Sequence, residues 1–507
     1  MQSHLVRVTG GRARFRRSVL GTACSVIALM LFLGAKTTLA QTASTGALTG
    51  TVSDPSGGVV PEAAVHVINV ATGDRHDFAS QPSGSYLAPL LLPGTYRIEV
   101  SKSGFKTAVL EGIVVSVTET HTVDIKLTVG EVSQSVTVST EAQLLQTQNQ
   151  ALGHVTDERM VEGLPLVTRN YTQILDLSPG VSSDVNDAGA MGVGNAIISS
   201  HGAVVNDNNF QMNGVSVTDL DSGTAIPVPN PDAIQEFKVQ TGQYDASFGR
   251  DAGANVDVLT KGGGNQFHGV AFEFLRNDDF NANDFFLNAA GKPRAVLKQN
   301  QFGGSLGGPI KRDKLFFFGS YQGTRQRNGL DPACLGSFST PTELTGLSDR
   351  SAASLGAAFA NQPGVLGPPV APDGSNISPQ ALALLNATVP GGGFLIPVPQ
   401  NANGTSSVSQ ACPFTENQFL ANADYTQSDR STWSERFFWA NNDEALNFRP
   451  SAGTGGGNVP GFPFSTANQF RNVSISNNYI FSSNLVNQLV LGYNRQVLNS
   501  SQGQATV

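Results

Sequence analysis

Residues 300–323 read NQFGGSLGGPIKRDKLFFFGSYQG, and this stretch decides the fold that the sequence predicts. Two segments rich in glycine and apolar residues flank four charged residues, Lys311–Lys314. In the first segment Phe302, Leu306 and Ile310 are an even number of positions apart, so an extended strand places them on one face. Because strands of a membrane barrel alternate between lipid-facing and polar side chains, we interpret the stretch as two membrane strands joined by a turn in water.

The composition favours a β-rich protein over a helical one. Of the 507 residues, 14% are charged, and there are 55 Gly and 26 Pro, which suits many turns and few long helices. The mean hydropathy is −0.10, and no apolar run long enough for a membrane helix follows the N-terminus. We therefore predict a mainly β protein, which a membrane barrel would satisfy.

The motifs of common enzymes are missing from the sequence. There is no Walker-type phosphate loop, no C-x-x-C pair, and no histidine followed by glutamate with zinc-site spacing. The formal net charge of −8 also argues against nucleic-acid binding. We predict no enzyme, no cofactor, no metal site and no nucleic-acid partner.

The first 40 residues have the features of a secretory signal peptide. The segment up to Arg17 contains five arginines and no acidic residue, an apolar stretch spans 19–35, and small residues follow at Thr38 and Ala40. We predict cleavage after Ala40. A membrane-anchoring helix is the alternative.

Two cysteines remain after that cleavage, Cys334 and Cys412. In an exported protein they are candidates for a disulfide. Both lie in one long loop-like segment, which the bond would staple, and free thiols are the alternative.

Residues 41–129 are predicted to form a β-sandwich, because short alternating strands are separated by turn signals every eight to twelve residues. The segments GTVSDPSGGVVPEAAVHV (50–67) and GSYLAPLLLPGTYRIEVSKSGFK (84–106) resemble the carboxypeptidase regulatory-like domain. The resemblance implies a transthyretin-like or carbohydrate-binding-like sandwich. It implies no peptidase activity.

Residues 130–262 have mixed patterns, with a short helix predicted around 156–161 and glycine-rich loops. Three segments, at 164–181, 211–219 and 234–269, occur in the expected order. Together they resemble the plug of a TonB-dependent outer-membrane receptor of the Oar-like kind. The most specific of the three is IQEFKVQTGQYDASFGRDAGANVDVLTKGGGNQFHG. The resemblance implies an α+β plug domain.

A short extended segment, EVSQSVTV, lies between the predicted sandwich and plug. In the resembled family a segment near this place pairs, as an added strand, with the TonB energy-transducing complex. The residues that carry this candidate contact are Glu131, Val132, Ser133, Val136 and Val138. The alternative is the last strand of the sandwich, since alternating valines fit both.

Residues 263–507 are predicted to be the N-terminal part of a transmembrane antiparallel β-barrel. In FHGVAFEFLRN, the side chains of Val270, Phe272 and Phe274 share one face, which we predict to contact outer-membrane lipid. Further strands, each near the length that crosses a bilayer, are predicted at 315–326, 418–426, 432–441, 470–481 and 485–495.

The connections between these strands alternate in length. Long ones span 277–297, 327–417 and 442–469, whereas KRDK, SDRS and SSN are short. Outer-membrane barrels have short periplasmic turns and long extracellular loops, so the alternation favours a barrel over a soluble hairpin protein. Single-chain barrels have an even number of strands, and plugged ones about twenty-two. Because about seven strands precede Val507, we expect this sequence to be truncated within an incomplete barrel.

The resemblance implies a ligand-gated receptor in the cell outer membrane that takes up a nutrient and is driven by TonB from the periplasmic side. The extracellular ligand is not indicated by the sequence, although the sandwich makes a carbohydrate one candidate. The alternative is a secreted or cell-surface protein that uses the sandwich for carbohydrate binding or adhesion.

Overall fold

The computed structural model describes residues 44–132, 135–139, 150–183, 191–192, 197–219, 222–244, 248, 251–283, 285–289, 294–331, 333–360, 362, 367–388, 393–447, 463–482 and 485–502. The predicted signal peptide, residues 1–40, lies outside these ranges. Within them, every helix is too short or too polar to cross a membrane.

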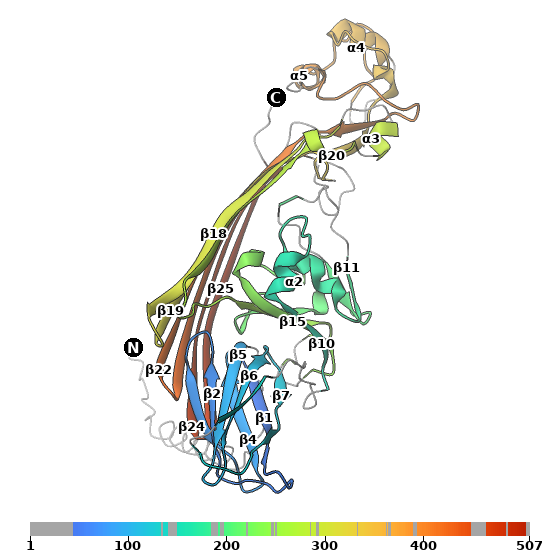
Figure 1. Cartoon of the computed structure of the whole chain (residues 1–507). Coiled ribbons are helices and arrows are strands. Elements are labelled where there is room, and N and C mark those ends of the chain that lie inside the picture. Colours follow the sequence, from blue (N-terminus) through green and yellow to red (C-terminus); the bar gives the residue numbers. More distant parts are fainter. Residues whose placement is uncertain are drawn as a thin grey trace, which may run out of the picture. The chain divides into compact units, whose positions relative to one another are not determined.

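Nine strands form two sheets in the N-terminal part of the described chain (Figure 1). They are β1 (Gly46–Ser53), β2 (Ala64–Asn69), β3 (Arg75–Ala79), β4 (Ser85–Leu91), β5 (Gly94–Ser101), β6 (Thr107–Val115), β7 (Thr120–Thr122), β8 (Ile125–Lys126) and β9 (Ser135–Ser139). One sheet has the order β4-β1-β7 with β8 also paired to β1, and the other has the order β3-β2-β5-β6-β9.

The two N-terminal sheets share one hydrophobic core. In β2 every second side chain is buried, as expected for a strand with one face inside. Leu48 and Tyr86 from the first sheet and Val65 and Ile98 from the second belong to the same buried cluster. The apolar alternation in the sequence therefore places these strands face to face.

A third sheet lies between residues 152 and 260. Its elements and their neighbours are β10 (Leu152–Asp157), α2 (Glu158–Gly163), η1 (Tyr171–Leu177), β11 (Val181–Ser183), β12 (Ile198–Ser200), η2 (Val205–Asp207), β13 (Asn209–Met212), β14 (Val215–Ser216), η3 (Pro231–Ala233), β15 (Ile234–Gly242) and β16 (Asn255–Thr260). The sheet order is β10-β15-β16-β13-β14. The helix predicted around 156–161 is confirmed as α2, which begins after Asp157 because that carboxylate accepts a hydrogen bond from the Met160 amide at 2.9 Å.

Seven antiparallel strands form the large sheet of the C-terminal half (Figure 1). They are β17 (His268–Asn277), β18 (Leu297–Lys311), β19 (Leu315–Asn328), β22 (Cys412–Ser428), β23 (Ser431–Leu446), β24 (Phe464–Ser482) and β25 (Leu485–Gln502), paired in this order. The connections hold η5 (Asp278–Phe280), α3 (Phe285–Ala289), β20 (Leu335–Ser339), η6 (Thr342–Leu344), α4 (Ala352–Ala358), α5 (Pro379–Asn386) and β21 (Thr405–Ser409). Among the described residues the sheet is open, with β17 and β25 at its edges.

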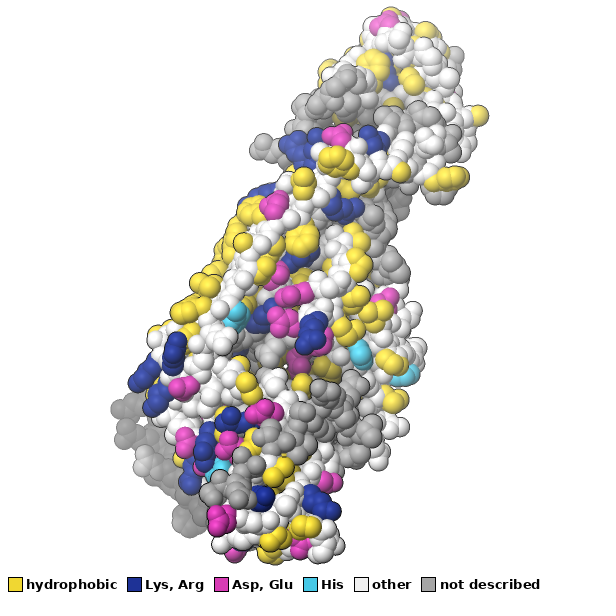
Figure 2. Space-filling view, in the orientation of Figure 1, with side chains coloured by type: hydrophobic (Ala, Val, Ile, Leu, Met, Phe, Trp, Pro, Cys, Tyr) yellow, Lys and Arg dark blue, Asp and Glu magenta, His cyan; other side chains and the backbone are white. Residues whose placement is uncertain are grey.

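The two faces of the large sheet differ in chemistry. On one, here called the outer face, Leu306, Tyr321, Phe419 and Phe437 are exposed, and the strand register aligns them. On the opposite inner face, alternate residues are buried and many are polar; they include Gln301, Ser320, Gln322, Gln418, Asn422, Asn472 and Ser474. Figure 2 shows hydrophobic side chains following the left edge of the molecule, with Lys and Arg side chains gathered at the lower end of that edge.

Candidate functional site

Described residues between 164 and 260 lie on the inner face of the large sheet. The Asn230 amide donates to Gln418 Oε1 at 2.9 Å, and Asn230 Nδ2 donates to Ser320 Oγ at 3.1 Å. From the large sheet, which we call the wall, Gln301 Nε2 donates to the Thr168 carbonyl at 3.0 Å. Polar side chains of the strands therefore find their hydrogen-bond partners on the covering segment, as buried polar groups require.

Further contacts hold the third sheet itself against the wall. Asn422 Nδ2 donates to Thr260 Oγ1 at 2.9 Å, and Ser474 Oγ donates to the Asn213 carbonyl at 3.0 Å. The buried apolar cluster of the third sheet also includes wall residues, namely Phe318, Leu420, Phe438, Ala440 and Phe470. The end of β16 and the turn between β13 and β14 thus contact the large sheet.

Arg169 joins this covering segment to two wall strands. Its guanidinium forms a buried ion pair with Asp232, and its Nε donates to Gln322 Oε1 at 3.3 Å. The guanidinium carbon lies 4.4 Å from the ring centroid of Phe272 and 4.1 Å from that of Phe274, within the range of a cation–π interaction. The backbone of Arg169 adopts a left-handed conformation, with φ of 55°.

The structure contradicts the prediction that Val270, Phe272 and Phe274 face lipid. Residues directly opposite each other in an antiparallel pair project from the same face. Phe274 lies opposite Gln301, and Val270 lies opposite Ser305 on the inner face. The two rings pack against Arg169 instead of turning outward, so apolar character in this strand does not mark the lipid side.

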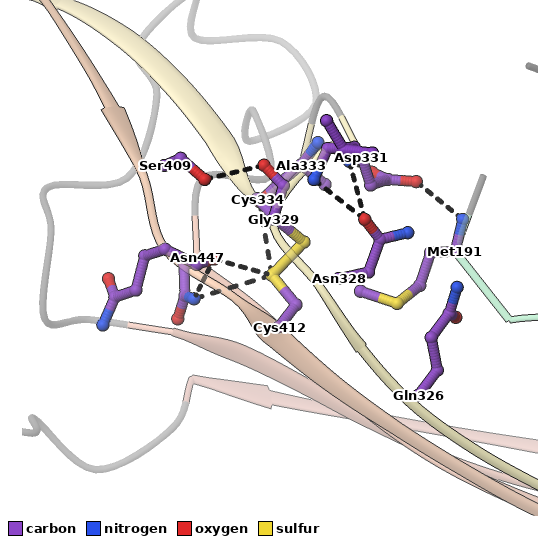
Figure 3. The surroundings of a disulfide bond; sticks show 12 residues. Met191, Gln326, Asn328, Gly329, Asp331, Ala333, Cys334, Ser409, Cys412 and Asn447 are labelled. Atoms are coloured by element: carbon purple, nitrogen blue, oxygen red, sulfur yellow. Dashed lines mark hydrogen bonds between the residues drawn. A yellow bond between two sulfur atoms is a disulfide. The ribbon is translucent and has the colours of Figure 1, made fainter. Parts of the chain in front are cut away.

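A disulfide joins Cys334 and Cys412 at the base of the connection between β19 and β22 (Figure 3). Cys412 begins β22 and lies opposite Asn328 at the end of β19, and the Gln410 amide donates to the Cys334 carbonyl at 2.9 Å. The bond therefore closes the long connection where it leaves the sheet, as a staple of that loop would.

The covering segment also reaches the base of this loop. The Met191 amide donates to Asp331 Oδ2 at 2.9 Å (Figure 3). The Gly192 amide donates to Gln326 Oε1 at 2.7 Å. Met191 packs against the cluster that contains the disulfide. A movement of the base of the long loop would consequently alter the hydrogen bonds of residues 191 and 192.

The candidate TonB-contact segment is an edge strand in the structure. Strand β9 pairs in parallel with β6, with Val136 opposite Ala108 and Val138 opposite Leu110. Val132 precedes it, and its carbonyl accepts from Thr107 Oγ1 at 2.9 Å.

The side chains of Glu131, Val132 and Val136 are exposed. Ser133 lies outside the described residues. The segment is thus the last strand of its sheet, and its edge position also suits strand addition, so both interpretations of the sequence remain.

Three charged residues of the site escaped the sequence prediction: Arg169, Glu236 and Lys238. The latter two are buried on one face of β15, where they alternate with apolar residues in EFKV. Charged residues at every second position of an otherwise apolar strand are a signal that could have marked a polar interface.

Two segments of the chain match known protein families, and the chain is similar to one curated transporter. Residues 259–507 match the family model of the Outer membrane beta barrel domain, and residues 47–128 match that of the Carboxypeptidase regulatory-like domain. Over 313 residues the chain is 25% identical to the TonB-dependent transporter Oar of Myxococcus xanthus, a match that covers 57% of this chain. The chain spans 28% of the length of Oar.

Two solved structures are similar in the path of the chain. The outer membrane transporter YddB from Escherichia coli has a TM-score of 0.43 and 12% identity, covering 68% of this chain and 38% of YddB. The siderophore receptor PirA from Acinetobacter baumannii has a TM-score of 0.33 and 14% identity, covering 68% of this chain and 48% of PirA. On the family models and the Oar match, the chain is an outer-membrane homologue of the TonB-dependent transporter Oar, with a carboxypeptidase regulatory-like domain ahead of an outer membrane beta barrel domain.

Proposed function

We propose that the full-length protein is a TonB-dependent receptor that takes up a nutrient through its barrel, with residues 130–262 acting as the plug. The observation that carries the proposal is the set of contacts between residues 164–260 and the inner face of the large sheet. A segment seated on the polar face of a barrel wall blocks the lumen, so it must move or be remodelled before a solute passes.

The hydrogen bonds between residues 164–260 and the large sheet suit a plug that separates from the barrel wall. Its polar contacts include amide and hydroxyl hydrogen bonds, such as Asn230 to Gln418 and Asn422 to Thr260. Each such bond has a net value of only about 1 kcal/mol, because water replaces it when the groups separate. A ligand promotes the separation only through a higher affinity for the opened state.

The ends of the barrel would carry different partners. The long connection closed by Cys334 and Cys412 would lie outside, where loops bind ligand, and a carbohydrate is one candidate. On the periplasmic side, the edge strand β9 with its preceding residues would meet TonB by strand addition.

In-cell disulfide cross-linking tests the TonB contact. We expect Val136→Cys in the full-length protein to cross-link to a cysteine placed in the C-terminal domain of TonB. Val70→Cys is the matched control, because Val70 is also an exposed valine of the N-terminal part, in the turn after β2, but does not belong to the segment. Equal cross-linking at both positions, or none at Val136→Cys, would refute this role.

A further inference from the structure

Strand β15 presents a strip of three buried polar side chains to a loop of the N-terminal domain. The docking strip consists of Glu236, Lys238 and Gln240, which occupy alternate positions and so project from one face. Their exposed fractions are 7%, 1% and 1%. The docking loop, residues 117–121, follows β6 and includes the first two residues of β7.

Every side chain of the docking strip bonds to the docking loop. The contacts are the Val117 amide to Glu236 Oε1 (2.6 Å), Lys238 Nζ to the Thr118 carbonyl (3.4 Å), Lys238 Nζ to Glu119 Oε1 (3.2 Å) and Gln240 Nε2 to Thr118 Oγ1 (3.3 Å). Within the docking loop, Thr118 adopts a left-handed backbone conformation with φ of 54°. Four contacts along one strand define a continuous docking surface.

Carboxylates outnumber their cationic partners at this joint. Lys238 lies opposite the buried Asp257 in the neighbouring strand, and among the described residues neither carboxylate oxygen of Asp257 has a hydrogen-bond partner. Glu119 lies between Lys238 and His121, whose Nε2 is 3.2 Å from Glu119 Oε2. With Glu236 this makes three carboxyl groups around one lysine, of which Glu236 and Asp257 are buried and Glu119 is partly buried. Burial of an unpaired charge favours uptake of a proton.

We propose that the docking strip and docking loop form a proton-linked joint, which holds the N-terminal domain on β15 at mildly acidic pH and loosens it as the pH rises. The partner that binds the docking strip is the docking loop of the same chain. The joint goes beyond the proposed transport function and does not depend on TonB or on a ligand.

The sign of the pH effect follows from Glu236. Burial raises the pKa of its carboxyl to about 7. The negative charges of Glu119 and Asp157 also raise this pKa, whereas the hydrogen bond from Val117 and the positive charge of Lys238 lower it. A carboxyl that regains water on undocking returns toward its ordinary pKa of about 4.5. Its favourable contribution to docking is therefore full below about pH 4.5 and is lost as the pH rises through about 7.

Glu119 sets the lower limit of the window. Burial acts to raise the pKa of this carboxyl, but the contacts with His121 and Lys238 outweigh it, so the pKa is lowered. Its contribution to docking is present above its ordinary value and lost on acidification below it. Between about pH 5 and 8 the carboxyl part of the joint therefore follows Glu236 together with Asp257, whose pKa burial also raises to about 7 against the effect of Lys238.

Hydrogen exchange in the full-length protein tests the joint directly. The Val117 amide is protected by Glu236 when the loop is docked, so its protection factor, corrected for the intrinsic pH dependence, reports docking. We expect protection to fall roughly tenfold between about pH 5.5 and about pH 8. Glu236→Gln keeps an oxygen acceptor for Val117, and we expect it to flatten the pH profile.

The matched control is Glu158→Gln, because Glu158 pairs with Lys261 away from the docking loop; we expect it to keep the wild-type profile. A wild-type protection factor that does not change with pH would overturn the proposal without any variant. So would a Glu236→Gln protein that retains the full pH dependence.

Discussion

At the scale of single residues, Arg169 joins segments that are far apart in the sequence. It pairs with Asp232 and stacks over Phe272 and Phe274, about one hundred positions further along. A left-handed conformation at a non-glycine residue is unfavourable by about 1 kcal/mol, and the contacts of the guanidinium offset it. The sequence places Arg169 in a plug-like segment, but local pattern carries no information on partners so distant.

We expect Arg169→Met to weaken the seating of residues 164–260 by about 3 kcal/mol or more, because it leaves the buried Asp232 without its counter-charge. The measurement is protease cleavage between 164 and 181 in the full-length protein at increasing urea concentration. Cleavage should begin at lower urea in the variant.

The double variant Arg169→Met with Asp232→Leu is the control for this interpretation. Removing both charges should recover part of the loss, since no buried charge then remains unpaired. If the single variant resists cleavage as well as the wild type, the ion pair does not hold the segment.

At the scale of elements, the sequence predicted all seven strands of the large sheet but underestimated the lengths of β22, β23, β24 and β25. For example, a strand predicted at 418–426 is observed as β22, Cys412–Ser428. Thr415 and Glu416 break the apolar alternation, yet they continue the ladder opposite Arg325 and Thr324. Apolar alternation ends where a strand leaves lipid, whereas backbone pairing continues into water, so the pattern marks only the central part.

The long connection between β19 and β22 was predicted without internal elements, but it contains β20, β21, α4 and α5. A signal for α5 was present in the sequence. Ser378 caps the helix by accepting from the Ala381 amide, and Pro379 occupies the first turn, a combination typical of helix starts. The pairing of β20 with β21 spans more than sixty residues and has no comparable local signal.

The linker between the third sheet and β17 needs glycine at 263. A Cβ there would lie 2.4 Å from the Phe317 carbonyl oxygen and 2.8 Å from that of Gly308. Both atoms belong to paired strands that cannot give way cheaply. We expect Gly263→Ala to cost about 1–3 kcal/mol by overpacking and to lower the urea concentration at which proteases reach residues 164–181.

Gly367→Ala is the matched control for the linker, because a Cβ at that position has open space. It should leave the urea profile unchanged. A Gly263→Ala protein that behaves like this control would show that the close approach does not position the linker.

At the scale of the whole molecule, the order of the parts and the alternation of long and short connections could be predicted from the sequence. The direction in which β17 faces could not. In isolation Val270, Phe272 and Phe274 look like the lipid side, but pairing with β18 aligns Phe274 with the buried Gln301. The face of a strand is set by its neighbours across the sheet, so a single alternating segment decides only which side chains belong together.

The central claim is that the large sheet turns Leu306 and Phe437 to lipid and Ser320 and Gln418 to the plug. The exposed fractions in the structure are 53% and 39% for the first pair, against 3% and 1% for the second. Single cysteines at the four positions of the full-length protein, labelled with a fluorophore in outer membranes, can be probed with a quencher confined to the bilayer. Quenching at 306 and 437 but not at 320 and 418 is the predicted result; quenching at 320 and 418, or its absence at 306 and 437, would contradict the account.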